Sequence, residues 1–271
     1  MIKIKAYAKI NYRLNVLGKR PDGYHEVETY MQAIDLYDDV SICCEDGGDG
    51  LVIDLAPGRE DLPSDSGNLA YRAAVKMHET FHQSRSEKIS IEVVKRIPVA
   101  AGLAGGSADA AAVINGLAAL WGIENDPELL AAAAKLGADV PFCVSAQQGN
   151  FAAIGTGTGA DLTPASPRRY KILLSTPDIT VPTKAVYGEL KPEDYAEAFT
   201  GFGNHLQAPS LRLFPGIEDV MEAHRRLPGR IVTQLSGSGP SVFSLFEPDG
   251  EISDYSTIST RYFTVLTETK I

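Results

Sequence analysis

The architecture of this chain can be inferred from one segment, Pro98-Val-Ala-Ala-Gly-Leu-Ala-Gly-Gly-Ser107, and from the alanine-rich segment 108–121 that follows it. The apolar segment predicts a helix, and the proline and three glycines predict a turn that leads into it. Glycines let backbone N–H groups converge on a ligand without a Cβ in the way. A helix start adds unpaired N–H groups and a partial positive charge. The segment therefore predicts a phosphate-binding loop at the start of a helix.

This loop follows neither of two common phosphate-binding patterns. No Gly-Lys-Ser/Thr follows the glycines, and Ala104 stands at the second glycine position of Gly-x-Gly-x-x-Gly. A structural role is also open at this point. In that role the segment is a glycine-rich turn that ends in a helix cap, with Ser107 as the N-cap and Asp109 near the positive helix end.

The composition is that of an acidic globular protein. Of the 271 residues, 44% are hydrophobic and 22% are charged, and the formal net charge is −10. This balance argues against a general nucleic-acid or anionic-membrane surface, so local donors must hold any anionic ligand. No apolar run approaches the length of a membrane span. The sequence does not indicate an oligomeric state.

The cysteines and the first residues of the chain indicate the cellular compartment in which the protein is expected. Cys43, Cys44 and Cys143 form no Cys-x-x-Cys pattern and are odd in number, which favours thiols in a reducing compartment. The segment 1–6 alternates apolar and charged side chains and lacks the continuous apolar core of a signal peptide. We therefore expect a cytoplasmic protein.

Strand and helix patterns mix irregularly along the chain, which favours an α+β fold over a doubly wound sheet. Alternation and apolar runs predict strands over 2–10, 27–34, 40–44, 51–55, 89–97, 142–154, 171–175, 231–235, 241–246 and 262–266. Helices are predicted over 68–82, over 108–121, from Asp126-Pro127 onward, and over 215–227. Prolines at 164 and 167 mark the expected boundary, which divides the chain into domains 1–163 and 164–271.

Two short segments hold side chains suited to binding. Lys9 and Asn11 share one face of a strand if Ile10 faces the core, and together they suit a phosphate or a hydroxyl group. Tyr24 and His25 follow a turn and offer a nucleobase a flat ring and two ring nitrogens. The structural alternatives are a solvated strand face and a surface turn.

Two further segments are candidates for chemistry. Asp139 precedes an apolar segment that contains a proline, which suits a catalytic carboxylate or, alternatively, the cap of a turn. The second glycine loop, Ser236-Gly-Ser-Gly-Pro-Ser241, lies between two predicted strands. It can offer backbone donors to an anion, or it can be a tight hairpin turn.

A zinc-hydrolase pattern is also present, at His78-Glu-Thr-Phe-His82. Met77 and Phe81 are apolar positions on the same predicted helix, so the histidines are expected to flank its buried stripe. No third ligand motif follows. We therefore expect no zinc site at this segment.

Six segments together make the chain similar to the GHMP kinase superfamily, over roughly residues 3–246. They are Ala8-Lys-Ile-Asn11, Arg20-Pro-Asp-Gly-Tyr-His25, Asn68-Leu-Ala-Tyr71, the loop 98–107, Gly137-Ala-Asp-Val-Pro141 and Ser236-Gly-Ser-Gly-Pro240. The glycine loops resemble those of the superfamily as a whole. The Lys-Ile-Asn start with Asp-Gly-Tyr-His resembles the branch whose substrate carries a cytidyl group.

The resemblance implies a two-domain α+β GHMP kinase fold. Its N-terminal domain would be like the second domain of ribosomal protein S5, and its C-terminal domain would be ferredoxin-like. The resemblance also implies ATP and Mg²⁺ as co-substrates. The phosphorylated small molecule would be a cytidine diphosphate-linked methylerythritol, modified at its 2-hydroxyl in a step of the non-mevalonate isoprenoid pathway.

The resemblance also implies roles by position. Lys9 and Asp139 would be the catalytic pair, and Asn68 would lie near the adenine. The ATP-binding residues would be Asn68, Pro98, Gly102, Leu103, Ala104, Gly105, Gly106 and Ser107. The residues that bind the cytidyl substrate would be Asn11, Tyr24, His25, Thr183, Tyr187, Gly237 and Gly239.

The chain departs from the family pattern at one segment. Asn204-His-Leu-Gln207 stands where the family usually has Asn-Asp-Leu-Glu, although it contains none of the proposed catalytic residues. No acidic metal ligand of the kind found in some GHMP kinases stands out, so the ligands of Mg²⁺ stay unassigned.

Two other functions remain open from the sequence. The first is a GHMP kinase that acts on homoserine, mevalonate or a sugar, which would have no use for a cytosine-reading Tyr24 and His25. The second is a nucleotide-binding sensor of the same fold, which would be expected to lose Lys9 and Asp139.

Overall fold

The computed structural model describes residues 1–47, 50–252 and 255–271, and these form two compact units. The first unit comprises residues 1–8, 36–99 and 104–150. The second comprises residues 9–35, 100–103 and 151–271. Each unit is therefore assembled from several segments of the chain, and the division at residue 163 stays a prediction.

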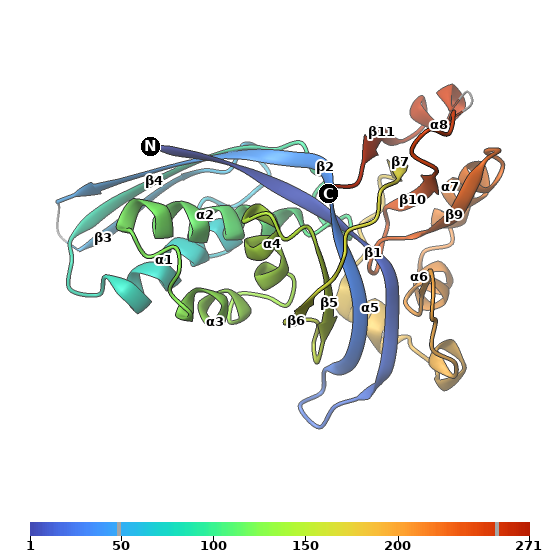
Figure 1. Ribbon diagram of the computed structural model, residues 1–271, viewed down its shortest axis with the longest axis horizontal. Coiled ribbons are helices and arrows are strands. Elements are labelled where there is room, and N and C mark those ends of the chain that lie inside the picture. Colours follow the sequence, from blue (N-terminus) through green and yellow to red (C-terminus); the bar gives the residue numbers. More distant parts are fainter. Residues whose placement is uncertain (48–49, 253–254) are drawn as a thin grey trace. The chain divides into compact units, whose positions relative to one another are not determined.

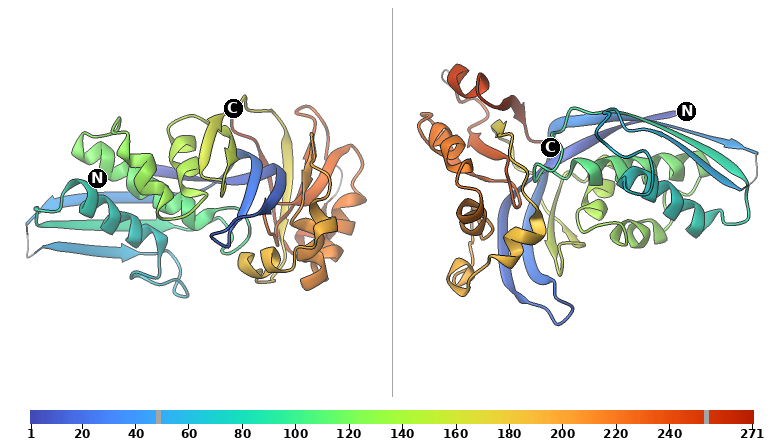
Figure 2. Two further views of the ribbon diagram at one scale, coloured as in Figure 1. Left: turned by 90° about the horizontal axis from the view of Figure 1, so that it is seen from below. Right: turned by 180° about the vertical axis from the view of Figure 1, so that it is seen from behind.

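Two long strands run through both units. They are β1 (Ile2–Lys19) and β2 (His25–Asp46), neighbours in one sheet, and the turn between them forms the blue hairpin tip in Figure 2. The sequence predicted strands over 2–10, 27–34 and 40–44, so the positions were right but the lengths were wrong. The prediction had a gap at residues 35–39, yet β2 passes through this segment without interruption.

The first unit is a sheet covered by helices. Its other strands are β3 (Leu51–Ala56) and β4 (Glu87–Val94), which pair in parallel, while β4 pairs antiparallel with the 39–46 part of β2. Figure 1 shows its helices together on one face of the sheet. They are α1 (Leu69–Phe81), α2 (Gly105–Trp121), α3 (Glu128–Ala134) and α4 (Val140–Gln147).

The second unit contains an antiparallel sheet in the order β11-β7-β10-β9. Its strands are β7 (Lys171–Thr176), β9 (Arg230–Leu235), β10 (Val242–Phe246) and β11 (Phe263–Glu268). The unit also holds β5 (Ala152–Thr156), β6 (Asp161–Pro164) and β8 (Gly203–Asn204). Its helices are α5 (Thr183–Gly188), η1 (Pro192–Tyr195), α6 (Gln207–Leu213), α7 (Ile217–Arg225) and α8 (Ser256–Ser259).

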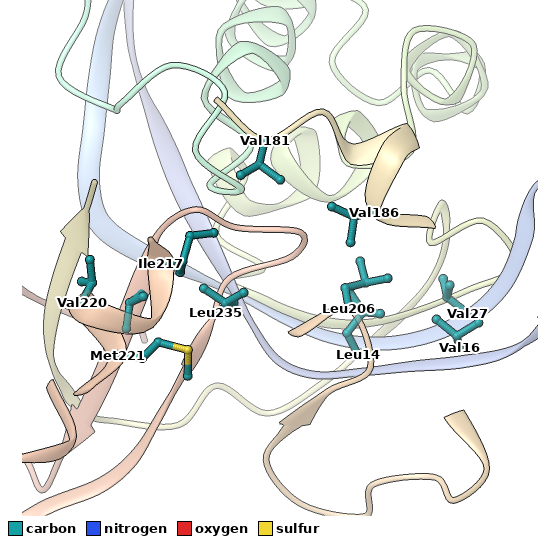
Figure 3. Close-up of a cluster of buried hydrophobic side chains, with 11 residues drawn as sticks. Leu14, Val16, Val27, Val181, Val186, Leu206, Ile217, Val220, Met221 and Leu235 are labelled. Atoms are coloured by element: carbon teal, nitrogen blue, oxygen red, sulfur yellow. The ribbon is translucent and has the colours of Figure 1, made fainter. Parts of the chain in front are cut away.

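An apolar cluster holds the second unit together around its long strands. Leu14 of β1 and Val27 of β2 are buried in one cluster with Val186 of α5, Leu206 and Leu235, as Figure 3 shows. These side chains come from segments that are far apart along the chain. Because Leu14 and Val27 share this core with the later helices, the N-terminal hairpin is an integral part of the unit.

The largest error of the sequence-based prediction concerns residues 142–154. A strand was expected there, but α4 occupies Val140–Gln147 and β5 begins only at Ala152. Nearly every side chain of α4 is buried, so no helical periodicity marks it. The usable signal was Pro141 in the first helical turn, where a proline favours a helix start.

The start of α2 also differs from the prediction. The helix begins at Gly105, and its N-cap position is held by Ala104 in the left-handed region. Ser107 therefore lies inside the first turn and is not the N-cap. At α3 the expected N-cap Asp126 does accept a hydrogen bond from Glu128 N (2.8 Å), although the formal cap position is Pro127.

A buried polar network ties α7 to the antiparallel sheet. The ring of His224 is fully buried, and its nitrogens lie 3.0 Å from Ser244 Oγ and 2.9 Å from Ser175 Oγ. Burial lowers the pKa of His224 to about 4. The imidazole is therefore neutral in the fold at ordinary pH.

Among the described residues, no helix is long and apolar enough to cross a membrane.

Candidate functional site

The second unit contains a buried chain of hydrogen bonds that starts at Lys9. Lys9 Nζ donates to Asn11 Oδ1 (2.8 Å), and Asn11 Nδ2 donates to Thr29 Oγ1 (2.7 Å). Thr29 Oγ1 in turn donates to the carbonyl of Arg13 (2.9 Å). Lys9 is 4% exposed and Asn11 is 2% exposed. The predicted sharing of one strand face by Lys9 and Asn11 is confirmed, and the chain of hydrogen bonds fixes the position of both side chains.

The first glycine loop has a strained backbone. Ala100, Gly102 and Ala104 have φ angles of 52°, 75° and 59°. Left-handed backbone is unfavourable for alanine, at about 1–2 kcal/mol per residue, and such strain concentrates at functional sites. The loop thus holds, immediately before α2 begins, a conformation that its two alanines do not prefer.

The two glycine loops interlock within the second unit. A Cβ on Gly102 would lie 2.1 Å from the carbonyl oxygen of Ser236 and 3.0 Å from that of Gly239. Ser236 Oγ donates to the Gly102 carbonyl (2.9 Å), and Ser241 N donates to the Ala101 carbonyl (3.3 Å). Glycine at 102 is therefore required by close backbone approach as well as by its positive φ.

The second glycine loop is a hairpin connection whose carbonyl groups are tied down. The strands on either side, β9 and β10, pair antiparallel. Asn204 Nδ2 donates to the carbonyls of Leu235 (3.0 Å) and Gly237 (2.7 Å), and Ser210 Oγ donates to that of Ser238 (2.5 Å). Because the C=O and N–H of one trans peptide point in opposite directions, the N–H of Ser238 points away from Asn204. That N–H is therefore directed to the other side of the loop.

The second glycine loop also lies against the Lys9 chain of hydrogen bonds. A Cβ on Gly237 would lie 3.8 Å from Lys9 Nζ and 3.6 Å from Asn11 Oδ1. Asn11 and Gly237, which the resemblance assigned to the cytidyl substrate, are therefore neighbours within one unit.

The other predicted cytidyl-binding residues of this unit include a stacked pair of aromatic rings and a threonine that contacts the second glycine loop. The rings of His25 and Tyr187 stack with centroids 5.1 Å apart and an interplanar angle of 27°. Thr183 Oγ1 lies 2.9 Å from Ser238 Oγ, so α5 contacts the second glycine loop. Tyr24 is 67% exposed. Partial burial, with the nearby charge of Lys19, lowers the pKa of His25, so its ring is neutral near pH 7.

A buried ion cluster lies under the start of α2 in the first unit. Lys95 Nζ donates to Asp38 Oδ2 (2.5 Å) and to Asp109 Oδ2 (2.7 Å). Asp38 is fully buried and Asp109 is 6% exposed. Burial acts to lower the pKa of Lys95, but the charges of Asp109 and Asp38 outweigh it and raise that pKa. Lys95 is therefore charged in the fold.

The remaining predicted site residues have local structural roles. Asn68 is the N-cap of α1: its Oδ1 accepts from Ala70 N (3.0 Å), and its Nδ2 donates to the Pro63 carbonyl (2.9 Å). Asp139 is partly buried at the N-cap position of α4. Leu103 is buried, and its carbonyl accepts from the backbone N–H of Lys9 (3.1 Å). Pro98 lies in the loop before α2.

The two histidines of the zinc-hydrolase pattern at 78–82 contact protein groups. His78 Nε2 lies 2.9 Å from the Arg85 carbonyl, while His82 Nδ1 lies 2.8 Å from Glu87 Oε1 and stacks on Trp121. Within residues 1–47, 50–252 and 255–271, no group of three or more His, Cys, Asp or Glu could hold a metal ion. The described side chains thus build no all-protein metal cage, whether for zinc or for Mg²⁺.

Several supporting residues were missed from the sequence. Asn204 and Ser210 hold the second glycine loop, Thr29 fixes Asn11, and Lys95 with Asp38 lies under α2. No local motif marks these residues, because each acts on a segment far away along the chain. Asn204 belongs to the segment that departs from the family pattern, where it nevertheless contacts the proposed substrate residue Gly237.

Comparison with known proteins agrees with this geometry. The model of the GHMP kinases N terminal domain matches residues 68–147. The chain is 40% identical, over 93% of its length and 90% of the relative's, to a 4-diphosphocytidyl-2-C-methyl-D-erythritol kinase from Geobacillus thermodenitrificans. It is 38% identical to a kinase of the same name from Acetivibrio thermocellus, over 91% of this chain and 90% of that one.

Solved structures of GHMP kinases also resemble this chain. A crystal structure of 4-(cytidine 5'-diphospho)-2C-methyl-D-erythritol kinase superposes with a TM-score of 0.80 at 32% identity, covering 100% of both chains. A mevalonate kinase superposes with a TM-score of 0.70 at 12% identity, covering 99% of both chains, which is a likeness of fold alone. These matches confirm the α+β GHMP kinase fold that the sequence resemblance implied.

Proposed function

Because this chain belongs to the 4-diphosphocytidyl-2-C-methyl-D-erythritol kinases of the GHMP kinase family, we propose that it transfers the γ-phosphoryl group of ATP to the 2-hydroxyl of 4-diphosphocytidyl-2-C-methyl-D-erythritol. The reaction is a step of isoprenoid biosynthesis. The three cysteines are thiols, which supports a cytoplasmic location for this step.

One observation carries the proposal: the buried Lys9–Asn11–Thr29 chain of hydrogen bonds lies directly against the second glycine loop. A lysine held at a fixed point by a buried amide is suited to stabilise charge on a phosphoryl group, because phosphoryl transfer depends mainly on positioning and electrostatics. The amide of Asn11 is itself fixed by Thr29, so the ammonium group is positioned before substrate arrives.

The bonds exchanged in the proposed step are few. The bond between the γ-phosphorus and the bridging oxygen to the β-phosphate breaks, and the 2-hydroxyl oxygen bonds to that phosphorus. ADP leaves, and the hydroxyl proton passes to Asp139 and then to water. Lys9 stabilises the transferring group, and Asn11 orients the reacting end of the substrate.

The other residues bind the two substrates. The loop from Pro98 to Ser107 holds the ATP phosphates with backbone N–H groups at the start of α2, and Asn68 lies near the adenine. His25, stacked on Tyr187, hydrogen-bonds the cytosine, with Tyr24 and Thr183 beside it. The second glycine loop, through Gly237 and Gly239, holds the substrate's own diphosphate.

Mg²⁺ accompanies the nucleotide in this proposal. Mg²⁺ keeps several waters and is commonly bound through substrate phosphates with one or two carboxylates. The absence of a three-ligand group among the described residues is compatible with that mode, and we assign no protein ligand to the ion. When bound, the ion would neutralise phosphate charge.

The test is an ATP-dependent kinase assay with 4-diphosphocytidyl-2-C-methyl-D-erythritol, run beside homoserine and mevalonate. We expect turnover of the cytidyl substrate, measured by coupled detection of ADP and by mass spectrometry of the product. Turnover of homoserine or mevalonate instead would be consistent with the assigned phosphate-binding loop but would contradict the assigned cytidine-binding residues. Nucleotide binding with no turnover of any alcohol would favour a sensor.

A further inference from the structure

The carboxyl group of Asp109 is incompletely satisfied. Its Oδ2 accepts from Lys95 Nζ, whereas its Oδ1 is buried and has no hydrogen-bond partner among the described residues. Asp38, in the same cluster, accepts from Arg96 N (2.5 Å) and Ile97 N (2.9 Å) as well as from Lys95. The two carboxyl groups share one lysine, but Asp38 has the better set of donors.

The charges of this cluster do not balance when both carboxyl groups are ionised. One ammonium faces two carboxylates, so the buried cluster carries a net charge of −1. A buried carboxylate with an unpaired oxygen is costly, and protonation relieves that cost. The carboxyl group that gains most from a proton is Asp109.

The cluster lies directly under the first turn of α2. Asp109 follows Gly105 by one helical turn, which places both on the same face of the helix. A Cβ on Gly105 would lie 3.5 Å from Lys95 Nζ. The neighbouring helices present uncharged side chains there: Leu69 of α1 faces Gly106, and Gln147 of α4 donates to the Ala108 carbonyl (2.9 Å). The charged groups that act on Asp109 are Lys95 and Asp38.

We propose that Asp109 takes up a proton when nucleotide phosphates bind at the start of α2, so that the cluster beneath the loop changes from negative to neutral. This inference rests on the proposed ATP site. A fixed negative charge near the loop disfavours a polyanion, and the polyanion in turn favours the protonated carboxyl group by the same free energy. Asp109 is thus a residue that tunes nucleotide affinity without contacting the reacting atoms.

The titration of Asp109 supports this role. Burial raises its pKa above the ordinary range of a carboxyl group, the charge of Lys95 opposes that rise, and the charge of Asp38 adds to it. The raised pKa brings protonation of this carboxyl group closer to neutral pH, and a nearby change of charge shifts the balance between its two protonation states. A carboxyl group at its ordinary pKa would stay ionised whether or not nucleotide is bound.

Calorimetry of nucleotide binding tests the proposal on the intact protein. Mg²⁺–ATP is titrated at pH 7.5 without the alcohol substrate, in two buffers that differ in protonation enthalpy. A rise of one unit in the pKa of Asp109 on binding gives an uptake of up to about half a proton per nucleotide. We expect this uptake in the wild type and its loss in Asp109→Asn. Asp39→Asn is the matched control, because Asp39 is an exposed carboxylate on β2 paired with Arg96; it should keep the uptake.

The affinity should follow the same pattern. We expect nucleotide binding by the wild type to weaken by up to about tenfold from pH 6.5 to 8.5, the effect of one unit charge about 10 Å away at an effective dielectric constant of about 20. Asp109→Asn should bind with little dependence on pH. A carbon-13 titration of the Asp109 carboxyl group in the wild type, with and without nucleotide, gives the answer if that variant does not fold.

Four outcomes would count against the inference. Uptake that persists in Asp109→Asn, or a carboxyl pKa that nucleotide does not move, assigns the proton elsewhere. Nucleotide binding without proton uptake overturns this inference and leaves the proposed function standing. No nucleotide binding by the wild type overturns the proposed function, and this inference falls with it.

Discussion

At the scale of single residues, the molecule fixes its functional side chains by burying the groups that hold them. Asn11 can position Lys9 because Thr29 occupies the other end of its amide. The sequence placed Lys9 and Asn11 on one face, since alternation along a strand is local. It could not reveal Thr29, which lies 18 residues away and reaches Asn11 only after the two strands pair.

The proposed role of Asp139 predicts a catalytic defect. Asp139→Asn keeps the size of the side chain and removes the proton acceptor, so we expect turnover to fall by about 10²-fold or more while ATP binding persists. Steady-state kinetics with calorimetry of ATP binding measures both. Asp126→Asn is a matched control at another helix start. Turnover close to that of the wild type in Asp139→Asn would contradict the assignment.

The stacked ring of His25 predicts a binding defect of a different kind. His25→Ala removes a hydrogen bond to the cytosine, so we expect KM for the cytidyl substrate to rise about tenfold, equivalent to about 1–2 kcal/mol, with kcat little changed. His25→Gln should recover part of the loss, because an amide can donate and accept. An unchanged KM in His25→Ala at saturating ATP would exclude this role.

Burial of His224 predicts how stability depends on pH. Its pKa is about 4 in the fold and about 6.5 in the unfolded chain, so the unfolded state binds more protons between these values. The contribution of neutral His224 to the free energy of unfolding is therefore fully present above about pH 6.5, and it is lost as the pH falls toward 4. Between pH 7 and pH 5 we expect a loss of about 2 kcal/mol in the free energy of unfolding.

Chemical denaturation at both pH values measures this loss. His224→Gln keeps polar atoms near Ser244 and Ser175 but does not titrate, so its stability should change less over the same interval. An equal pH dependence in the two proteins would show that other groups are responsible.

At the scale of elements, the two glycine loops behave as one structure. The sequence predicted both loops because glycine patterns are local, but their contact joins segments that are 134 residues apart. The same reasoning explains why the strand predicted over 142–154 was wrong at α4. A run of buried apolar residues is compatible with a strand or a helix until the surrounding helices are placed.

Gly102→Ala tests the interlocked loops. Its Cβ would meet the Ser236 carbonyl oxygen at 2.1 Å and would occupy a positive φ. We expect a loss of about 1–3 kcal/mol in the free energy of unfolding and a raised KM for ATP. Gly188→Ala is the control, because no atom lies within 4 Å of its added Cβ and its φ is not positive. Equal stability of the two variants would contradict the packing described.

At the scale of the whole molecule, the resemblance gave the fold class, whereas local patterns did not reveal how the chain is divided. The compact units are built from separated segments of the chain. The domain division at residue 163 remains a prediction. Alternation and turn signals report neighbours along the chain, and the assembly of segments 9–35 and 151–271 depends on contacts between distant ones.

This organisation predicts that the fragment 164–271 does not fold fully when expressed alone. It lacks Leu14, Val16 and Val27, which share a core with Val186 and Leu206. We expect weak protection of amide hydrogens around α5 and α6, measured by hydrogen exchange. Addition of fragment 1–163 should restore that protection. Full protection in the isolated fragment would show that the N-terminal hairpin is dispensable.

The separated segments of each unit also limit how such an enzyme can diversify. A recombination event exchanges one uninterrupted stretch of gene, but no single stretch encodes either unit without part of the other. A new substrate preference cannot be imported as a ready-made module. It has to arise by point substitutions within a shared scaffold, and each change near one ligand must be tolerated by the long strands that run through both units.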